Sequence, residues 1–355
     1  MANAVVFMNP VPSKAPQISC FKFLKVISPC FSQVSVISSS LDDTDDAKII
    51  NVKYKKQNNK IIRLINFFWF QLKVFFKALF TIKKGDYAFF WVGDKMFSSM
   101  LVCKLKRVKT YFFLYGMTSL ENASKKAQTT KKSQEYLADK ADYICVESPS
   151  VLTDRGRELT DKVKIIHLFV DDLGVLHNRE NKVGMLCRLA SGKCVLESIE
   201  GFAKFHQNFP DYTLHIVGDG ILYDECKKLV RELSAESYIT LHGWLLHDEL
   251  FKIMPSWKLL LFPTKTEGMP NSVLESMSMG IPVLASPVGG IRDIILNYEN
   301  GYVLEKDDCD SIAQALSEVM SSDTLQKVSQ KAKATIDERF TLEKAQMNFK
   351  SQMGF

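Results

Sequence analysis

The second half of the sequence alternates short apolar runs with amphipathic helical patterns, and this alternation constrains the fold more than any other feature. The apolar runs have the length and composition of β-strands: Val183–Leu189, Tyr212–Gly218, Tyr238–Gly243, Trp257–Thr264 and Ile281–Ser286. The helical patterns lie between and after them: Cys194–Phe209, Ile221–Ala235, His247–Met254, Asn271–Met279, Ile291–Leu296 and Asp307–Ser322. Strands that are apolar throughout and are connected by helices form parallel sheets covered on both faces. The sequence therefore predicts a doubly wound α/β domain.

The first half shows the same alternation in a less regular form. Its expected strands are Ala4–Asn9, Val34–Ser40, Tyr87–Gly93, Thr110–Gly116, Tyr143–Ser148 and Lys162–Leu168. A single core rarely grows beyond roughly 250–300 residues, so a chain of this length is expected to form two domains. We predict an N-terminal domain over residues 1–168, a second over 169–340, and a C-terminal helix over 341–355 that packs back on the first. Two such domains face a central cleft, with ligands at the carboxyl ends of strands.

The composition is that of a soluble globular protein, with 46% hydrophobic and 24% charged residues. No apolar run approaches the ~20 residues of a membrane span, and no signal peptide is expected at the N-terminus. The eight cysteines are scattered without a C-x-x-C pair, which favours reduced core thiols in a cytosolic protein over a zinc site. Residues 1–165 contain 27 Lys and Arg against 14 Asp and Glu, and the remainder contains 19 against 26. The basic half could face nucleic acid or an anionic membrane, and no nucleic-acid-binding motif accompanies it.

The segment Ile61–Ile82 joins seven large aromatic residues to a narrow sector of polar and basic ones, which includes Arg63, Lys73 and Lys77. One interpretation is a buried helix that covers the sheet, with its cations at the solvent edge. The other is an interfacial helix, with aromatic side chains at the acyl boundary and cations on lipid phosphates. Lysines on both sides of the segment favour the second interpretation.

The strongest chemical signal is the segment Pro263–Gly290, which begins at the carboxyl end of an expected strand. Glu267 lies in a loop, where its carboxylate can accept hydrogen bonds from sugar hydroxyls. Pro270 is suited to the first turn of a helix, whose unpaired N–H groups favour a phosphate or an array of hydroxyls. Glu275, within that helix, would point to a second polyol such as a ribose, or would be an ordinary surface carboxylate.

Two further signals follow neighbouring strands. Arg188 and Lys193 bracket a short loop after Val183–Leu189, and their spacing lets both reach one anion. Arginine supplies a planar clamp and lysine a point charge, which together suit a diphosphate. The sequence IVGDG ends the next strand in a glycine turn, a pattern that many α/β proteins share.

Taken together, these motifs resemble the retaining glycosyltransferases of family 4 (glycosyl transferases group 1), which have the two-domain GT-B fold. The resemblance covers about residues 165–340 and rests on the pattern E-G-x-P-x-x-x-x-E, then S-x-G-x-P-V and a Gly-Gly turn, with R-L-x-x-x-K upstream. The matching residues are Arg188, Leu189, Lys193, Glu267, Gly268, Pro270, Glu275, Ser278, Gly280, Pro282, Val283, Gly289 and Gly290.

The resemblance implies a role for each matching residue. Arg188 and Lys193 would hold the donor diphosphate and stabilise the leaving nucleoside diphosphate, and Glu275 would bind the ribose. Glu267 would bind the transferred sugar, so that Arg188, Lys193 and Glu267 form the catalytic set. The remaining donor-binding residues would be Gly218, His242, Gly243, Trp244, Gly268, Met269, Asn271, Ser272 and Pro270. No metal or other cofactor is expected, and the D-x-D matches Asp43–Asp45 and Asp308–Asp310 are interpreted as solvated stretches.

The first half departs from the family pattern at two places. The loop Asn9–Lys14 has no glycine where members often carry two, and Tyr115 stands nearest to a position that is often histidine. The sequence therefore predicts a cytoplasmic, hexosyltransferase-type enzyme, peripheral on the inner face of the membrane through Ile61–Ile82. Its partners would be a nucleotide sugar and a glycan or lipid-linked acceptor in bacterial surface polysaccharide synthesis. The alternatives are a sugar-nucleotide epimerase of similar fold and a non-catalytic binding subunit.

Overall fold

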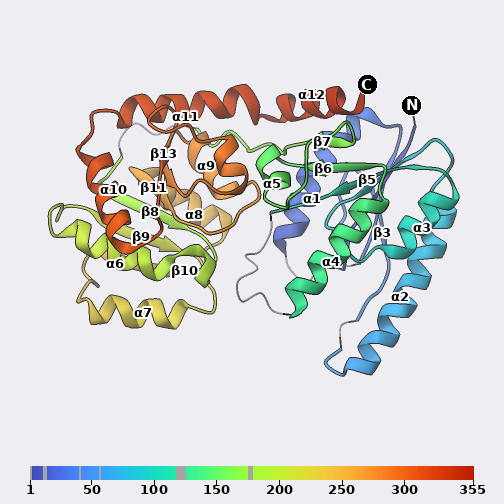
Figure 1. The fold of residues 1–355 in the computed structure, drawn as a ribbon, viewed down its shortest axis with the longest axis horizontal. Helices are drawn as coiled ribbons and strands as arrows, with labels where there is room; N and C mark the ends of the chain where they lie inside the picture. The colour runs from blue at the N-terminus through green and yellow to red at the C-terminus, as the bar shows by residue number, and fades with distance from the viewer. Residues whose placement is uncertain (1, 11–13, 40, 56, 117–124, 175–178) are drawn as a thin grey trace. The chain divides into compact units, whose positions relative to one another are not determined.

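The computed structural model describes residues 2–10, 14–39, 41–55, 57–116, 125–174 and 179–355. It divides into two compact units (Figure 1). The first comprises the described residues of Met1–Tyr115, Leu120–Phe169 and Leu342–Phe355, and the second those of Gly116–Ser119 and Val170–Thr341. Each unit is built on a parallel sheet with helices on both faces, which confirms the predicted α/β class.

Over the described residues, the first unit has a seven-stranded parallel sheet in the order β3-β2-β1-β4-β5-β6-β7. The strands are β1 (Ala4–Phe7), β2 (Val34–Ser38), β3 (Lys48–Asn51), β4 (Tyr87–Phe90), β5 (Lys109–Phe113), β6 (Tyr143–Val146) and β7 (Val163–Ile165). β1 and β4 lie side by side, and the chain order runs outward from them in opposite directions. Such a reversal leaves a crevice at the carboxyl ends of the two strands.

The first unit packs its core in two layers, because successive side chains of a strand point to opposite faces of the sheet. Phe89 of β4 lies on one face with Phe23 and Phe349 of the covering helices, and Phe90 lies on the other with Phe70. The helices are α1 (Lys14–Ile27), α2 (Lys60–Thr81), α3 (Phe97–Leu105), α4 (Lys125–Lys140), α5 (Pro149–Thr153) and α12 (Leu342–Met353).

The last helix, α12, belongs to the first unit although it follows the second in sequence. Ala345 and Phe349 are buried, and the Phe349 ring lies 6.4 Å from that of Phe23. The amide of Gln346 donates to the carbonyl of Lys25 at 3.1 Å. Burial of these apolar side chains on α1 accounts for the return of the chain to the first unit.

The second unit has, within the described residues, a six-stranded parallel sheet in the order β10-β9-β8-β11-β12-β13. The strands are β8 (Lys182–Leu186), β9 (Thr213–Val217), β10 (Ile239–Gly243), β11 (Leu259–Phe262), β12 (Val283–Ala285) and β13 (Tyr302–Val303). The helices are α6 (Val195–His206), α7 (Tyr223–Glu232), α8 (His247–Ile253), α9 (Asn271–Ser278), α10 (Cys309–Ser321) and α11 (Leu325–Arg339). Here the order reverses between β8 and β11.

Helix α2 covers the sheet, but it exposes large apolar side chains as well as cations, so the interpretation of Ile61–Ile82 as a buried helix with only its cations at the solvent edge is wrong in that respect. Phe70, Val74 and Ala78 are buried, whereas Phe80 is 80% exposed. Among the described residues, α2 is also the one helix long and apolar enough to cross a membrane by length and composition. The expectation that no segment approaches that length is therefore corrected. Membrane contact itself stays a prediction.

Candidate functional site

The candidate site lies at the carboxyl ends of β8 and β11 in the second unit. These neighbouring strands are the point at which the strand order reverses, and ligands of doubly wound sheets bind at such points. Arg188 and Lys193 follow β8, and Glu267 follows β11. The topology thus places the two predicted phosphate-binding cations and the predicted sugar-binding carboxylate at one edge of the sheet.

Lys193 is the central side chain of this edge. It ends a short 3₁₀ turn, Ser191–Lys193, just before α6. Its ammonium group donates to the hydroxyl of Thr264 at 3.2 Å and forms an ion pair with Glu267. The side chains of Lys193 and Glu267 are 18% and 17% exposed. The pair is thus mostly shielded from bulk water while keeping an accessible edge, where an added anion would interact with the lysine more strongly than in water.

Arg188, by contrast, is exposed and lies on the same connection. The structure therefore brings Lys193 and Glu267 into contact, and it leaves Arg188 at the surface of the β8–α6 loop.

A buried hydrogen-bond network fixes the two loops that carry Lys193 and Glu267. Thr264 is fully buried, and its hydroxyl donates to the carbonyl of Gly192 at 3.2 Å. Its backbone N–H donates to the hydroxyl of Ser286 at 2.9 Å, and Ser286 in turn donates to the carboxylate of Asp307. Sequence reasoning did not select Thr264, Ser286 or Asp307. The signal available in the sequence was the hydroxyl residue Thr264 at the end of an apolar strand.

Two glycines are required by the close approach of backbone at the site. Gly218 follows β9 with φ +142°, and a Cβ atom there would lie 1.8 Å from the carbonyl oxygen of Cys187. Gly289 has φ +51°, and a Cβ atom there would lie 2.0 Å from the carbonyl oxygen of Glu267. Any larger residue would displace the loops after β8 and β11. These glycines therefore shape the site through the backbone.

The segment after Glu267 leads into α9. Gly268 accepts a hydrogen bond from the N–H of Gly290 at 2.8 Å, which joins the predicted E-G motif to the Gly-Gly turn. Pro270 immediately precedes the helix, and Asn271 begins it. Ser272 and Glu275 are partly buried, and Glu275 lies in the second turn. The first turn of α9 leaves N–H groups without helical partners, as expected for an anion or hydroxyl site.

The residues predicted to lie near a nucleobase are on a more distant strand. His242 and Gly243 end β10, which is separated from β8 by β9. The backbone links them to the site, because Gly218 N–H donates to the carbonyl of Gly243 at 2.9 Å. Trp244 is 73% exposed. The structure thus places His242, Gly243 and Trp244 at the same sheet edge, two strands away from Lys193.

His242 forms a hydrogen-bonded pair with His215, which sequence reasoning missed. His242 Nε2 lies 3.0 Å from His215 Nδ1, and His215 Nε2 lies 3.1 Å from the hydroxyl of Thr213. Burial, and then the neighbouring His242, lower the pKa of His215 to about 4. Burial also lowers the pKa of His242. Both rings are therefore neutral near pH 7, and in the contact between them one ring nitrogen donates and the other accepts.

The first unit has its own crevice at the carboxyl ends of β1 and β4. Asn9 donates to the carboxylate of Asp94, and its side-chain oxygen accepts the N–H of Lys95 at 3.0 Å. A cavity of about 470 Å³ opens beside Pro10 and Lys95, and its wall includes Phe67. Residues 11–13 of the glycine-free loop Asn9–Lys14 lie outside the described residues.

Tyr115 is not available to this crevice, because its ring belongs to the core of the first unit. The ring lies 5.4 Å from that of Trp91 and 6.5 Å from that of Phe113.

The D-x-D sequence Asp308–Asp310 has structural partners. Asp308 caps α10 by accepting the N–H of Ser311 at 2.9 Å, and Asp310 forms an ion pair with Lys204. Asp43 and Asp45 lie in a polar stretch before β3, where Asp45 is part of a turn. In the described part of the chain, no group of three or more His, Cys, Asp or Glu side chains is arranged to hold a metal ion.

Comparison with known proteins gives sequence matches that include the unit of the candidate site, and structural matches to the whole fold. Residues 174–335 match the family model described as glycosyl transferases group 1. The UDP-Gal:alpha-D-GlcNAc-diphosphoundecaprenol alpha-1,3-galactosyltransferase of Escherichia coli is 29% identical over 136 residues, which are 38% of this chain and 35% of that protein. The poly(ribitol-phosphate) alpha-N-acetylglucosaminyltransferase of Staphylococcus aureus (strain COL) is 25% identical over 223 residues, 60% of this chain and 44% of that one.

This chain therefore spans less than half the length of either relative. The crystal structure of Anabaena Alr3699/HepE in complex with UDP and glucose superposes with a TM-score of 0.80 at 16% identity, and the match covers 99% of both chains. The shared architecture is the GT-B fold.

Proposed function

Because residues 174–335 of this chain belong to the glycosyl transferases group 1, we propose that the chain transfers a sugar from a nucleotide-sugar donor to an acceptor, with retention of anomeric configuration. The observation that carries the proposal is the Lys193–Glu267 pair at the reversal point of the second sheet. A cation beside a carboxylate suits a donor that carries a diphosphate next to sugar hydroxyls.

In this proposal the donor diphosphate binds Lys193, and the exposed Arg188 closes on it from the same loop. Their positive charges stabilise the leaving nucleoside diphosphate, so the reaction requires no metal ion. Glu267 accepts hydrogen bonds from the hydroxyls of the transferred sugar, beside the backbone of Gly268–Ser272. Glu275 binds the ribose, and the strand end His242–Trp244, with Gly218, lies on the base side.

We propose that the acceptor is a glycan or a lipid-linked saccharide of a bacterial surface polysaccharide. The two curated relatives support this class, since the name of one includes a diphosphoundecaprenol and that of the other a poly(ribitol-phosphate). The cavity at the carboxyl ends of β1 and β4 supports it as well, because it combines the cations Arg63 and Lys95 with the apolar Phe67 and Phe97. Such a lining suits an acceptor that is anionic at one end and apolar at the other.

A lipid-linked acceptor requires the enzyme to reach a membrane. We propose peripheral association with the inner face of the cytoplasmic membrane through Ile61–Ile82. The exposed apolar side chains of α2 support this location.

The experiment that tests the function is incubation of the protein with UDP-, GDP- and ADP-sugars, with and without a lipid-linked saccharide acceptor. The proposal expects a glycosylated acceptor whose new linkage keeps the anomeric configuration of the donor, read from the anomeric proton by NMR. An altered sugar nucleotide formed without acceptor would indicate an epimerase. Nucleotide binding without turnover on any acceptor would indicate a binding subunit.

A further inference from the structure

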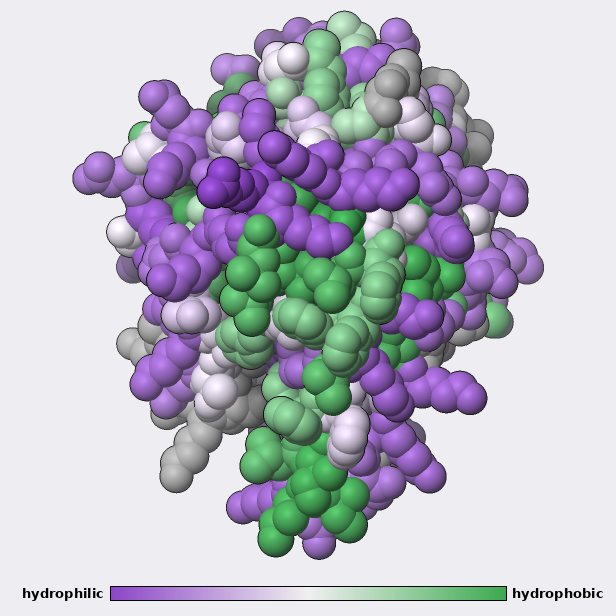
Figure 2. All heavy atoms as spheres, turned by 90° about the vertical axis from the view of Figure 1, so that its right-hand side faces the viewer, coloured by the Kyte–Doolittle hydropathy of each residue, from purple (hydrophilic) through white to green (hydrophobic). Residues whose placement is uncertain are grey.

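Helix α2 presents an apolar face away from the first unit. Phe70, Val74 and Ala78 face the core, and at 100° per residue the opposite side of the helix carries the large apolar residues. The exposed members of this outer face are Ile61, Ile62, Ile65, Phe68, Trp69, Phe76 and Phe80, with exposed fractions from 47% to 80%. Figure 2 shows apolar side chains gathered on the side of the molecule that carries α2 and α3, bordered by hydrophilic ones. A contiguous exposed apolar patch that is rimmed by polar residues marks an interaction surface.

The charge around α2 has one sign. The sequence contains no Asp or Glu between Asp46 and Asp86. The cations of that stretch are Lys48, Lys53, Lys55, Lys56, Lys60, Arg63, Lys73, Lys77, Lys83 and Lys84. A second copy of this chain paired on the α2 face would bring cations against cations without a carboxylate in the stretch to neutralise them. An anionic bilayer complements both the apolar face and the charge.

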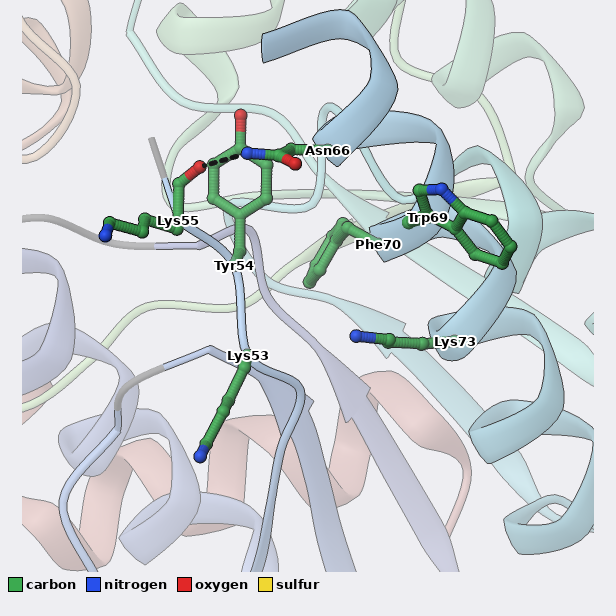
Figure 3. A pocket seen from close by; sticks show the side chains of 7 residues that line it. All are labelled: Lys53, Tyr54, Lys55, Asn66, Trp69, Phe70 and Lys73. Atoms are coloured by element: carbon green, nitrogen blue, oxygen red, sulfur yellow. Dashed lines mark hydrogen bonds between the residues drawn. The ribbon is translucent and has the colours of Figure 1, made fainter. Parts of the chain in front are cut away.

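A pocket of about 400 Å³ lies along the cationic edge of this face (Figure 3). Tyr54 and Phe70 form its apolar wall, with ring centroids 5.3 Å apart. The amide of Asn66 donates to the carbonyl of Lys55 at 3.1 Å, which ties the β3–α2 connection to the helix.

Of the residues that the structure describes, three lysines and no carboxylate line this pocket. Lys53 and Lys55 come from the connection, and Lys73 comes from α2. Figure 3 shows the Lys73 side chain extending toward the side of the helix on which Phe70 lies. Trp69 is also part of the lining and is 54% exposed.

We propose that α2 lies in the plane of an anionic bilayer with its outer face among the acyl chains, and that the pocket of Lys53, Lys55 and Lys73 binds the phosphate of one lipid headgroup. The proposal deepens the membrane association of the proposed function and rests on it. A phosphate offers oxygen acceptors to the lysine ammonium groups. Trp69, half exposed at the pocket, is the residue type that membrane–water interfaces favour. Because Phe70, Val74 and Ala78 are part of the protein core, the helix lies on the bilayer and does not cross it.

The first test compares two charge-matched double variants in co-sedimentation with vesicles at low salt. K53A/K73A removes two pocket lysines, and K77A/K84A removes two exposed lysines that do not line the pocket. Vesicles of phosphatidylcholine with phosphatidylglycerol are compared with phosphatidylcholine alone. A lysine near an anionic surface accounts for roughly a fivefold change in binding, and a lysine that donates to a phosphate for about tenfold or more. We expect K53A/K73A to bind at least about fivefold more weakly than K77A/K84A.

Equal losses in the two double variants would overturn the headgroup pocket, because diffuse attraction predicts equality. Failure of the wild-type protein to bind phosphatidylglycerol vesicles would overturn the whole proposal. If the wild-type protein then proved to be a dimer and F80S a monomer, the α2 face would be assigned to a second copy of the chain. Stabilisation by inorganic phosphate that depends on Lys73, without vesicle binding, would assign the pocket to a soluble phosphate and also contradict the proposal.

The second test addresses the apolar face. F80S should weaken vesicle binding, and I221S is the control, since Ile221 is 88% exposed on the second unit. Equal vesicle binding by these two variants would overturn the insertion of the face. Binding of UDP, GDP and ADP by every variant is measured without vesicles. Failure of the wild-type protein to bind any of UDP, GDP and ADP would count against the proposed function, whereas the vesicle comparisons decide the membrane site by themselves.

Discussion

At the scale of the residue, the central feature is a lysine and a carboxylate that meet from two different loops. Lys193 and Glu267 are 74 positions apart, yet the sequence pattern selected both. The pattern could not show that they form an ion pair, because contact depends on the buried Thr264 and its partner Ser286. Those two residues have no distinctive spacing in the sequence. Sequence reasoning therefore found the charged groups and missed the uncharged ones that position them.

The two glutamates of the site should separate in their effects. E275Q should weaken the binding of nucleoside diphosphate by about tenfold or more, since a hydrogen bond to a charged group would be lost on the ribose side. E267Q should lower kcat more than it raises KM, because Glu267 lies at the reacting end beside Lys193. Calorimetric titration of UDP and steady-state kinetics distinguish these outcomes. Unchanged affinity of E275Q for nucleoside diphosphate would refute the ribose assignment.

The His215–His242 pair predicts a dependence of stability on pH. The pKa of His215 is about 4 in the folded protein and near 6.5 in the unfolded chain. Between these values the unfolded chain binds more protons, so the free energy of unfolding should fall as pH falls from about 6.5 to 4. Urea unfolding of H215Q should show a shallower fall than the wild type, and H247Q, at an exposed histidine, should not. Parallel pH profiles for H215Q and wild type would contradict this account.

At the scale of the element, the strands were the most predictable part of the fold. Runs such as Leu259–Phe262 are apolar at every position and fully buried on both faces, which only a covered parallel sheet explains. Helix α2 was less predictable, because an apolar helix in sequence is equally compatible with a core and with a membrane. The structure shows that most of its outer apolar side chains are exposed, which depends on the neighbouring elements and not on the helix itself, and contact with a membrane stays a prediction.

The glycine after β9 should be required for the stability of the second unit. G218A places a methyl group against the carbonyl of Cys187 at a positive φ, and should lower the free energy of unfolding by about 1–3 kcal/mol. G192A is the matched control, because a Cβ atom there meets nothing within 4 Å. Chemical denaturation compares the two. Equal stability of G218A and G192A would mean that the loop after β8 moves freely.

At the scale of the whole molecule, the described chain forms two α/β units, in each of which the strand order reverses between two neighbouring strands. The donor chemistry is assigned to the second unit, and the acceptor and membrane chemistry to the first. The sequence supported the donor assignment by motif, and the acceptor and membrane assignment by positive charge and the aromatic segment Ile61–Ile82. The hydrogen bond between Asn9 and Asp94 became visible only when the structure brought β1 and β4 together.

Transfer should be independent of divalent metal ions. In the proposal, Lys193 and Arg188 supply the positive charge that stabilises the leaving diphosphate. Activity measured in excess EDTA should therefore equal that without chelator. Complete loss in EDTA that is restored by Mg²⁺ or Mn²⁺ would assign part of this role to a metal ion instead.

The most direct test of the central claim is the release of nucleoside diphosphate from a panel of nucleotide sugars by the wild type, K193A and the control K227A. Lys227 is an exposed residue of α7, on the same unit and outside the site. The account predicts turnover of at least one sugar nucleotide by the wild type and by K227A, and a loss of about 10²–10³-fold in K193A. Wild-type turnover in K193A, or no turnover of any donor by the wild type, would contradict it.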